Sequence, residues 1–260
     1  MTTARIEDLD WPAIAGDLDL QGWAVLPKLL TADQSDGIAG MYGDTPAFRS
    51  HVVMARHGFG KGEYRYFSYP LPDLVQELRT GLYPKLAPIA NGWHERMGAD
   101  IRFPATHAEF LERCHAAGQC RPTPLLLQYG RGDYNCLHQD LYGEHVFPLQ
   151  VAALLSEPHE AFEGGEFVLT EQRPRMQSRP AVVPLTKGDA VVFAVNSRPH
   201  RGSTGDYRVK MRHGSVKSAR VADTPWGSSS TTRLEGSSSI ETPARSSACQ
   251  QVHLKAAVRF

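Results

Sequence analysis

The chain has 260 residues, with 28 basic and 28 acidic side chains and a formal net charge of zero. A protein built around a polyanionic partner or a membrane surface usually carries an excess of lysine and arginine, so the composition gives no reason to expect either. No apolar run approaches the length of a bilayer span, and the opening residues lack the apolar segment of a signal peptide, so we expect a cytoplasmic protein with no membrane partner.

The four cysteines are too few to cross-link a chain of this length and show no Cys-x-x-Cys spacing, so we expect free thiols. A zinc site built from Cys114, His115 and Cys120 is disfavoured, because adjacent residues on a helix point apart.

Residues 1–120 are predicted to form a helical brace with covering loops that belongs to the same domain as the rest of the chain. Helices are expected at four places: residues 11–20, a segment capped by Thr31, residues 73–97 and residues 106–116. Pro84 and Pro88 interrupt the third of these, which predicts two helices or one kinked helix. A strand is expected over residues 22–27 and ends at a proline.

Residues 48–72 mix basic and aromatic side chains, among them Arg49, Arg65 and Tyr66. Such a mixture can form the mouth of a substrate site. An ordinary covering loop with pieces of strand explains it equally well, so both interpretations stay open.

Residues 121–214 contain many short apolar or alternating runs that are separated by turn signals. The expected strands lie at 124–129, 145–155, 166–170, 181–185, 190–195 and 207–213. This spacing predicts a mainly β fold, a sandwich or double-sheet barrel, with the helices outside.

A candidate metal motif, His138-Gln139-Asp140, follows the strand over 124–129 and the turn Gly130-Arg131-Gly132-Asp133. In an extended segment, residues two apart point to the same side, so the imidazole and the carboxylate can bind one ion together. One more histidine would complete a two-histidine, one-carboxylate face on iron(II) and leave the other coordination positions open.

Two histidines compete for the third position. His200 follows Arg198-Pro199 in an expected turn, whereas His213 ends a strand whose alternation puts it on one face with Met211. A strand holds a ligand more rigidly than a turn does, so the sequence favours His213.

Several motifs together resemble the Fe(II)/2-oxoglutarate-dependent dioxygenases: Tyr129, Gly132, His138-Gln139-Asp140, Gly164-Gly165-Glu166 and the run from Lys187 to Phe193. From Gly22 to Gly214 the chain is similar to a bacterial family of such oxygenases described as acting oxidatively on damaged DNA. More distant similarity extends to AlkB-type demethylases and prolyl hydroxylases.

The resemblance implies a double-stranded β-helix, or jelly roll, with iron held by His138, Asp140 and His213. It also implies that Tyr129, nine residues before the first ligand, helps to hold 2-oxoglutarate. Enzymes of this kind use O2 to convert 2-oxoglutarate to succinate and CO2 while they hydroxylate or oxidatively demethylate a substrate. The iron centre supplies the difficult chemistry, and the protein supplies geometry and substrate choice. A non-catalytic jelly-roll module that binds metal or a partner is the alternative from another class.

The substrate is less well defined by the sequence. A neutral chain without a long basic stripe favours an unknown small molecule or a protein side chain over nucleic acid. Nucleic acid stays open because six basic residues could assemble a local patch: Arg49, Arg56, Lys61, Arg65, Arg131 and Arg198.

Residues 215–260 form an atypical tail rich in Ser, Thr and Ala, which predicts disorder and a final jelly-roll strand that is missing or altered. In relatives, an arginine about ten residues beyond the distal histidine pairs with the far carboxylate of 2-oxoglutarate. Here that place is Asp223, and neither Arg220 nor Arg233 stands in the same register. The chain as written is therefore expected to bind iron weakly and turn over poorly, as an inactive enzyme would.

A codon argument suggests that this tail is an out-of-frame reading. Permitted codons for Gly214 to Thr232 exist such that one added G, in the opening run of Gs, gives Gly-Val-Ser followed by Ser-Gly-Arg-Arg and an apolar strand. This altered reading restores the valine, the arginine and the closing strand of the related proteins.

Overall fold

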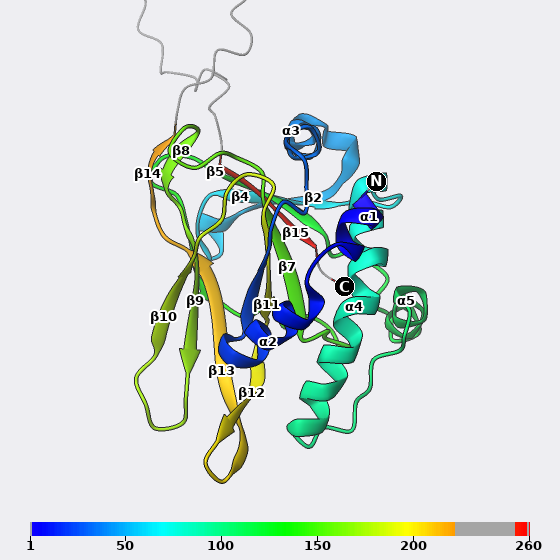
Figure 1. Ribbon diagram of the computed structural model, residues 1–260. Helices are drawn as coiled ribbons and strands as arrows, with labels where there is room; N and C mark the ends of the chain where they lie inside the picture. Colours follow the sequence, from blue (N-terminus) through cyan, green and yellow to red (C-terminus); the bar gives the residue numbers. More distant parts are fainter. Residues whose placement is uncertain (1, 222–252, 259) are drawn as a thin grey trace, which may run out of the picture.

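The computed structural model describes residues 2–221, 253–258 and 260 (Figure 1). The helices are α1 (Thr2–Glu7), α2 (Trp11–Gln21), α3 (Ala32–Gly40), α4 (Asp73–Arg96) and α5 (His107–Ala116), with 3-10 turns at Met41–Gly43, Thr45–Ala47 and Met54–Arg56. The early strands are β1 (Trp23–Leu26), β2 (Phe48–Val53), β3 (Gly60–Lys61), β4 (Glu63–Phe67), β5 (Leu125–Tyr129), β6 (Tyr134–His138) and β7 (Leu149–Leu154). The later strands are β8 (Phe162–Gly164), β9 (Phe167–Gln172), β10 (Arg179–Val183), β11 (Ala190–Ala194), β12 (Ser197–Gly202), β13 (Gly205–Ser215), β14 (Ser218–Val221) and β15 (His253–Val258).

The strands form two main antiparallel sheets. A seven-stranded sheet has the order β1-β11-β7-β15-β5-β4-β2, and a six-stranded sheet runs β10-β9-β13-β6-β3, with β12 paired to β13. Strands β8 and β14 form a separate pair. The mainly β fold with flanking helices that the sequence predicts is confirmed, and the first 120 residues add strands to both sheets as well as helices.

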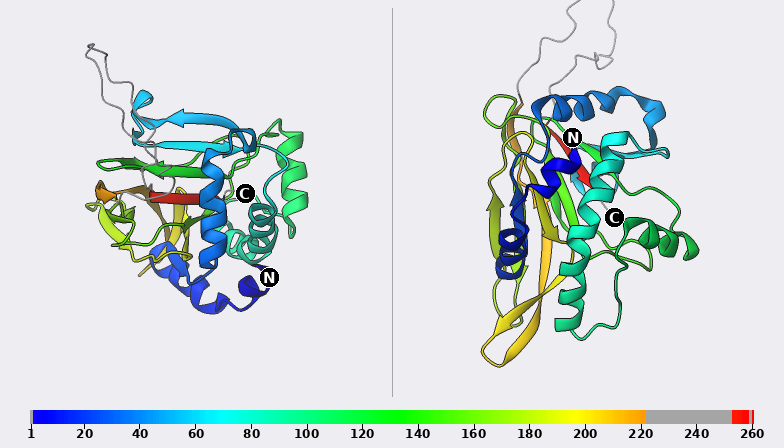
Figure 2. Two further views of the ribbon diagram at one scale, coloured as in Figure 1. Left: turned by 90° about the horizontal axis from the view of Figure 1, so that it is seen from above. Right: turned by 45° about the vertical axis from the view of Figure 1, so that its right-hand side comes forward.

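Every residue of β7 and β11 is buried, because these central strands are covered on both faces. On one side lies the six-stranded sheet, and on the other lie α4 and its neighbours (Figures 1 and 2). The buried face of α4 places leucines and Trp93 in the same apolar core as Leu126, Val151 and Val192. The two sheets therefore face each other and enclose a space that side chains from both can line.

Helix α4 is one continuous helix, although Pro84 and Pro88 lie inside it. Each proline removes a backbone donor, but the fully buried row that includes Leu82 and Leu86 ties the helix to the core, and this burial outweighs the lost hydrogen bonds. Of the two predicted alternatives, the single helix is therefore the one that the structure shows. The predicted starts of α3 and α5 are confirmed, because Thr31 and Thr106 both form capping boxes.

Near the end of the chain, β15 lies between β5 and β7 in the seven-stranded sheet. The expectation of a missing final strand is wrong in this respect: His253–Val258 satisfies backbone hydrogen bonds that β5 and β7 would otherwise leave unpaired. The predicted disorder is also wrong for Ser218–Val221, which form β14, where Arg220 lies 3.1 Å from Glu163. For residues 222–252, which include Asp223 and Arg233, the prediction lies outside the described residues. Within the described residues, no helix is both long enough and apolar enough to cross a membrane.

Candidate metal centre

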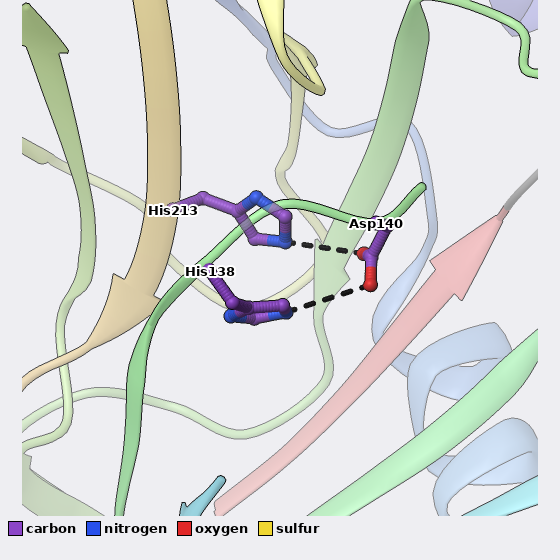
Figure 3. A group of neighbouring side chains, drawn as sticks. All are labelled: His138, Asp140 and His213. Carbon is purple, nitrogen blue, oxygen red and sulfur yellow. Dashed lines mark ion pairs between the residues drawn. The ribbon is translucent and has the colours of Figure 1, made fainter. Parts of the chain in front are cut away.

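Three side chains, two from neighbouring strands and one from the segment that follows the first strand, converge between the sheets. His138 ends β6, Asp140 follows two residues later, and His213 lies near the end of β13, directly opposite His138 in the register. The Nε2 atom of His213 lies 3.2 Å from one carboxylate oxygen of Asp140, and Nε2 of His138 lies 3.6 Å from the other (Figure 3). The potential ligand atoms all lie within 4.8 Å of one another, and this is the only such group among the described residues.

The hydrogen bonding of His138 points its second nitrogen toward the centre. Its Nδ1 lies 2.8 Å from the backbone carbonyl of Cys136, and because a carbonyl only accepts, Nδ1 carries the proton and donates. The lone pair is then on Nε2, the atom nearest to Asp140. A backbone contact of this kind fixes both the tautomer and the ring orientation of a metal-binding histidine.

His213 is held by aromatic packing. Its ring centroid lies 4.6 Å from that of Phe193 and 4.2 Å from that of His138. His213 and Asp140 are both buried, whereas His138 is partly exposed. A carboxylate buried beside two imidazoles is stabilised when a cation joins the group, since an isolated buried charge is costly.

A β-bulge aligns the two histidines. Between the paired positions His213–His138 and Ser215–Asn135, β13 has one residue, Gly214, and β6 has two. The extra residue changes the phase of β6, so that Asn135 and His138 both face the inner cavity, although residues three apart on a regular strand face opposite sides. A Cβ on Gly214 would lie 2.6 Å from the backbone oxygen of Asn135, so the bulge requires glycine here.

The residue between the two motif ligands connects them to the opposite strand. The side-chain amide of Gln139 donates to the backbone carbonyl of Met211 at 2.7 Å and to Oδ1 of Asn196 at 2.8 Å. Met211 lies two residues before His213 on β13. Sequence reasoning treated Gln139 as a spacer, and an amide at this position gave no signal that could have identified its role.

Two cavities adjoin the three residues, and Gln150 lines both. A narrow inner cavity lies between the sheets and contacts His138, His213 and Tyr129. A wider outer cavity of about 540 Å³ contacts Asp140, and its wall includes Arg49, Tyr66, Arg121 and Tyr142. The three residues therefore separate an inner space from an outer one.

Tyr129 lines the inner cavity, as its position in the sequence predicts, and it is buried. Burial raises the pKa of its hydroxyl far above the ordinary value, against the opposing influence of hydrogen bonds with Ser215 and Asn135. The hydroxyl is therefore a neutral hydrogen-bonding group, placed where it can contact a bound molecule and also where it joins two core strands. Its predicted role with 2-oxoglutarate stays a prediction.

His200 does not join the group. It lies in β12, paired with Tyr207, and not in a turn as the sequence suggested. Its ring packs edge-on against Tyr207, with centroids 5.2 Å apart. The alternation of β13 was the signal that favoured His213, the histidine that the structure places beside His138 and Asp140.

Two of the six basic residues considered for a nucleic-acid patch are committed to contacts within the protein. Arg198 is fully buried and forms an ion pair with Glu171, so it is unavailable to a partner. Arg65 donates to the backbone oxygen of Tyr42 at 2.9 Å and packs over that ring. Of the six, only Arg49 lines the outer cavity.

Comparison with known families identifies one clear relationship. A family model described as "Oxygenase, catalysing oxidative methylation of damaged DNA" matches residues 62–222, which is more than half of the chain. The uncharacterized protein Rv2227 of Mycobacterium tuberculosis strain H37Rv is 49% identical over 148 residues, which are 57% of this chain and 64% of the relative. MT2286 of strain CDC 1551 gives the same figures. The match thus spans less than two thirds of the relatives' length.

Solved structures with a related arrangement include a prolyl-4-hydroxylase from Pseudomonas putida, at a TM-score of 0.45 and 14% identity over 82% of this chain and 100% of the other. A prolyl hydroxylase from Trichoplax adhaerens, in complex with a hypoxia inducible factor peptide fragment, has a TM-score of 0.48 and 10% identity over 98% and 89%. The α-ketoglutarate-dependent epimerase SnoN from nogalamycin biosynthesis has a TM-score of 0.48 and 13% identity over 95% and 82%.

Proposed function

Because the chain belongs to the oxygenase family whose model matches residues 62–222, we propose that it is an Fe(II)- and 2-oxoglutarate-dependent dioxygenase that hydroxylates or oxidatively demethylates its substrate. The observation that carries this proposal is the group of His138, Asp140 and His213 at the boundary of two cavities. We further propose that the two facing antiparallel sheets form the double-stranded β-helix that the sequence resemblance implies.

The donor set fits iron(II). Two neutral imidazole nitrogens and one carboxylate form the facial arrangement typical of non-haem iron oxygenases, and they leave the other coordination positions open. The Cys136 carbonyl fixes the lone pair of His138 on Nε2, and Phe193 shields His213 from water. When bound, iron and 2-oxoglutarate supply the oxidising chemistry with O2, and the co-substrate leaves as succinate and CO2.

The residues around the inner cavity fit 2-oxoglutarate only in part. Tyr129, Asn135 and Ser215 offer neutral hydrogen-bonding groups. Among the described residues that line this cavity there is no lysine or arginine to pair with the far carboxylate. This favours low affinity for the co-substrate, and it supports a second candidate function, an inactive enzyme or metal-binding module that keeps the iron ligands without efficient turnover.

Turnover of 2-oxoglutarate tests the proposal and separates the two candidates. We expect slow iron-dependent release of succinate by the full chain, abolished in Asp140→Ala and retained in His200→Ala, with thermal unfolding showing that both variants fold. Asp140 binds the ion directly in our account, whereas His200 lies outside the group. Iron binding without succinate release would favour the inactive module, and full activity in Asp140→Ala would contradict the metal centre itself.

We propose a small molecule or a protein side chain as the substrate, ahead of nucleic acid. The outer cavity lies within the usual size range of small-molecule sites, and of the basic residues that could have bound a nucleic-acid backbone, Arg198 is buried and Arg65 is bonded to the backbone of Tyr42. The family description names damaged DNA, so an oligonucleotide belongs among the substrates to be tested.

A further inference from the structure

We propose that the outer cavity binds a small substrate with an acidic group, a carboxylate or a phosphate, and that Arg49 and Arg121 hold this group. The body of the substrate then lies against Tyr66 and Tyr142, and its reacting end lies beside Asp140. This inference rests on the proposed function, because it takes the outer cavity as the substrate site of the oxygenase.

The guanidinium of Arg49 is held in place before any ligand arrives. It lies over the ring of Tyr66, with its central carbon 4.3 Å from the ring centroid. Its Nε donates to the backbone carbonyl of Pro122 at 3.0 Å. Because the stacking and this hydrogen bond fix the plane of the group, little side-chain freedom remains to be lost on binding. The same hydrogen bond connects Arg49 to the segment that carries Arg121.

The charges of this arginine pair are not balanced within the protein. Among the described residues, no carboxylate pairs with Arg49 or Arg121. Partial burial, and then the nearby charge of Arg121, lower the pKa of Arg49, whereas Tyr66 opposes the shift. The arginines that brace the fold differ: Arg96 pairs with Asp206 at 2.8 Å, and Arg198 pairs with Glu171.

An anion is the ligand that such a pair favours. Guanidinium groups bind carboxylates and phosphates through charge-assisted, often bidentate hydrogen bonds. Among the described residues on the wall of the outer cavity, the only acidic side chain is Asp140, which is committed to the metal in our account. The titratable side chains on the described wall are otherwise Arg49, Arg121, His145, Cys120 and the two tyrosines, so the permanently charged side chains away from the metal are both arginines.

Size and lining define the rest of the ligand. A cavity of about 540 Å³ suits a small molecule. Tyr66, Tyr142 and Phe147 contribute aromatic surface to its wall, which favours a planar or apolar body between the acidic group and the reacting end.

The anion bound here is distinct from 2-oxoglutarate. His138, His213 and Tyr129 line the inner cavity, whereas Asp140 and the arginine pair line the outer one, and only Gln150 lines both. In the proposed arrangement the co-substrate has to widen the inner cavity, which measures about 40 Å³ in this structure, to reach Tyr129, whereas an acidic substrate beside Arg49 occupies the outer cavity. We expect the two to bind together without competition.

Binding of three aromatic probes to the full chain tests the proposal by ligand-observed NMR, with 2-oxoglutarate saturating. Phenyl phosphate and phenylacetate carry the two acidic groups, and benzyl alcohol is the neutral control. We expect both anions to bind and the alcohol to bind at least about tenfold more weakly, which corresponds to about 1.4 kcal/mol. The stronger of the two anions identifies the acidic group.

Variants assign the site. In Arg49→Ala with Arg121→Ala, the anions should lose about tenfold or more in affinity, and Arg49→Lys should lose part of it because lysine lacks the planar, bidentate group. Arg56→Ala is the matched control, since Arg56 is exposed, lies on the same N-terminal segment and does not line the cavity. Unchanged anion affinity in a folded double variant would overturn the proposal, and so would displacement of the anions by 2-oxoglutarate.

Mn(II) in place of iron distinguishes this inference from the proposed function. We expect paramagnetic broadening of the bound probe signals in the wild type and not in Asp140→Ala. Arginine-dependent anion binding without any Mn(II) binding would support the anion site and contradict the oxygenase proposal. Mn(II) binding without anion binding would overturn the anion site alone. A single-stranded oligonucleotide that binds far more tightly than phenyl phosphate would overturn the small-molecule class.

Discussion

The amide of Gln139 donates to the backbone carbonyl of Met211 at 2.7 Å and thereby connects the segment between His138 and Asp140 to the strand that carries His213. The same amide reaches Asn196, whose backbone oxygen accepts from the Met211 amide at 2.6 Å. The three residues that we propose as iron ligands come from two strands far apart in sequence and from the segment that follows the first of them. Gln139 adds a side-chain hydrogen bond to the backbone pairing of these strands.

Replacing Gln139 with Ala should weaken metal binding more than it destabilises the fold. Groups that orient metal ligands typically contribute about 10- to 100-fold in metal affinity, and we expect a loss in that range. Titration with Mn(II) measures it. Gln76→Ala is the control, because Gln76 lies on α4, away from the centre. Equal Mn(II) affinity in the two variants would show that Gln139 does not position the ligands.

Gly214→Ala should destabilise the protein and disturb the metal centre together. The added Cβ would lie 2.6 Å from the backbone oxygen of Asn135, so the bulge that aligns His138 with His213 must shift. We expect the free energy of unfolding to fall by about 1–3 kcal/mol, as overpacking commonly causes.

Gly92→Ala provides the matched comparison. Gly92 lies in helix α4 with nothing within 4 Å of the added Cβ, so alanine there should be neutral or stabilising. Chemical denaturation measures both variants. A Gly214→Ala protein as stable as the wild type, with unchanged Mn(II) affinity, would refute the role of the bulge.

Tyr129→Phe should raise the concentration of 2-oxoglutarate needed for half-maximal succinate release, because the hydroxyl lies at the inner cavity. The same hydroxyl interacts with Ser215 and Asn135, so a stability loss of about 1 kcal/mol is also expected. Tyr134→Phe, at a partly exposed position on β6, is the control. A large loss of stability with an unchanged 2-oxoglutarate requirement would make Tyr129 a core residue only.

Local sequence patterns predicted helix starts and strands well where neighbouring residues in the sequence decide the structure. The capping threonines Thr31 and Thr106 marked helix starts, and the alternation that ends at His213 marked the strand that brings it to His138. Prediction was incomplete where packing or pairing decides. The burial that keeps α4 one helix across Pro84 depends on partners far along the chain, whereas His200 belongs to a strand because β12 pairs with β13 in a hairpin, opposite Tyr207.

The residues of the outer cavity were also not predictable from local sequence patterns. Arg49 was one of several basic residues in an ambiguous segment, and only the fold separates it from Arg198, which is buried against Glu171. The bulge opposite Gly214 and the bond from Gln139 to Met211 join residues more than 70 positions apart. No local pattern encodes such contacts.

The frame-shift hypothesis for residues 215–260 makes a prediction at the level of the gene. We expect the nucleotides across codons 213 to 216 to contain a run of Gs in which one more G gives Gly-Val-Ser. The chain in that altered frame should bind 2-oxoglutarate more tightly, because its arginine supplies the cation that the inner cavity lacks among the described residues. A run with no such one-base repair would end the hypothesis, and so would robust turnover by the chain as written.

Anaerobic titration with Fe(II) followed by 2-oxoglutarate tests the central claim most directly, because a visible charge-transfer absorption reports the co-substrate bound to iron. We predict one Fe(II) per chain and this absorption in the wild type and in His200→Ala, with both lost in His213→Ala. That result would place iron between His138, Asp140 and His213. Iron binding and absorption that survive in His213→Ala but disappear in His200→Ala would contradict the account.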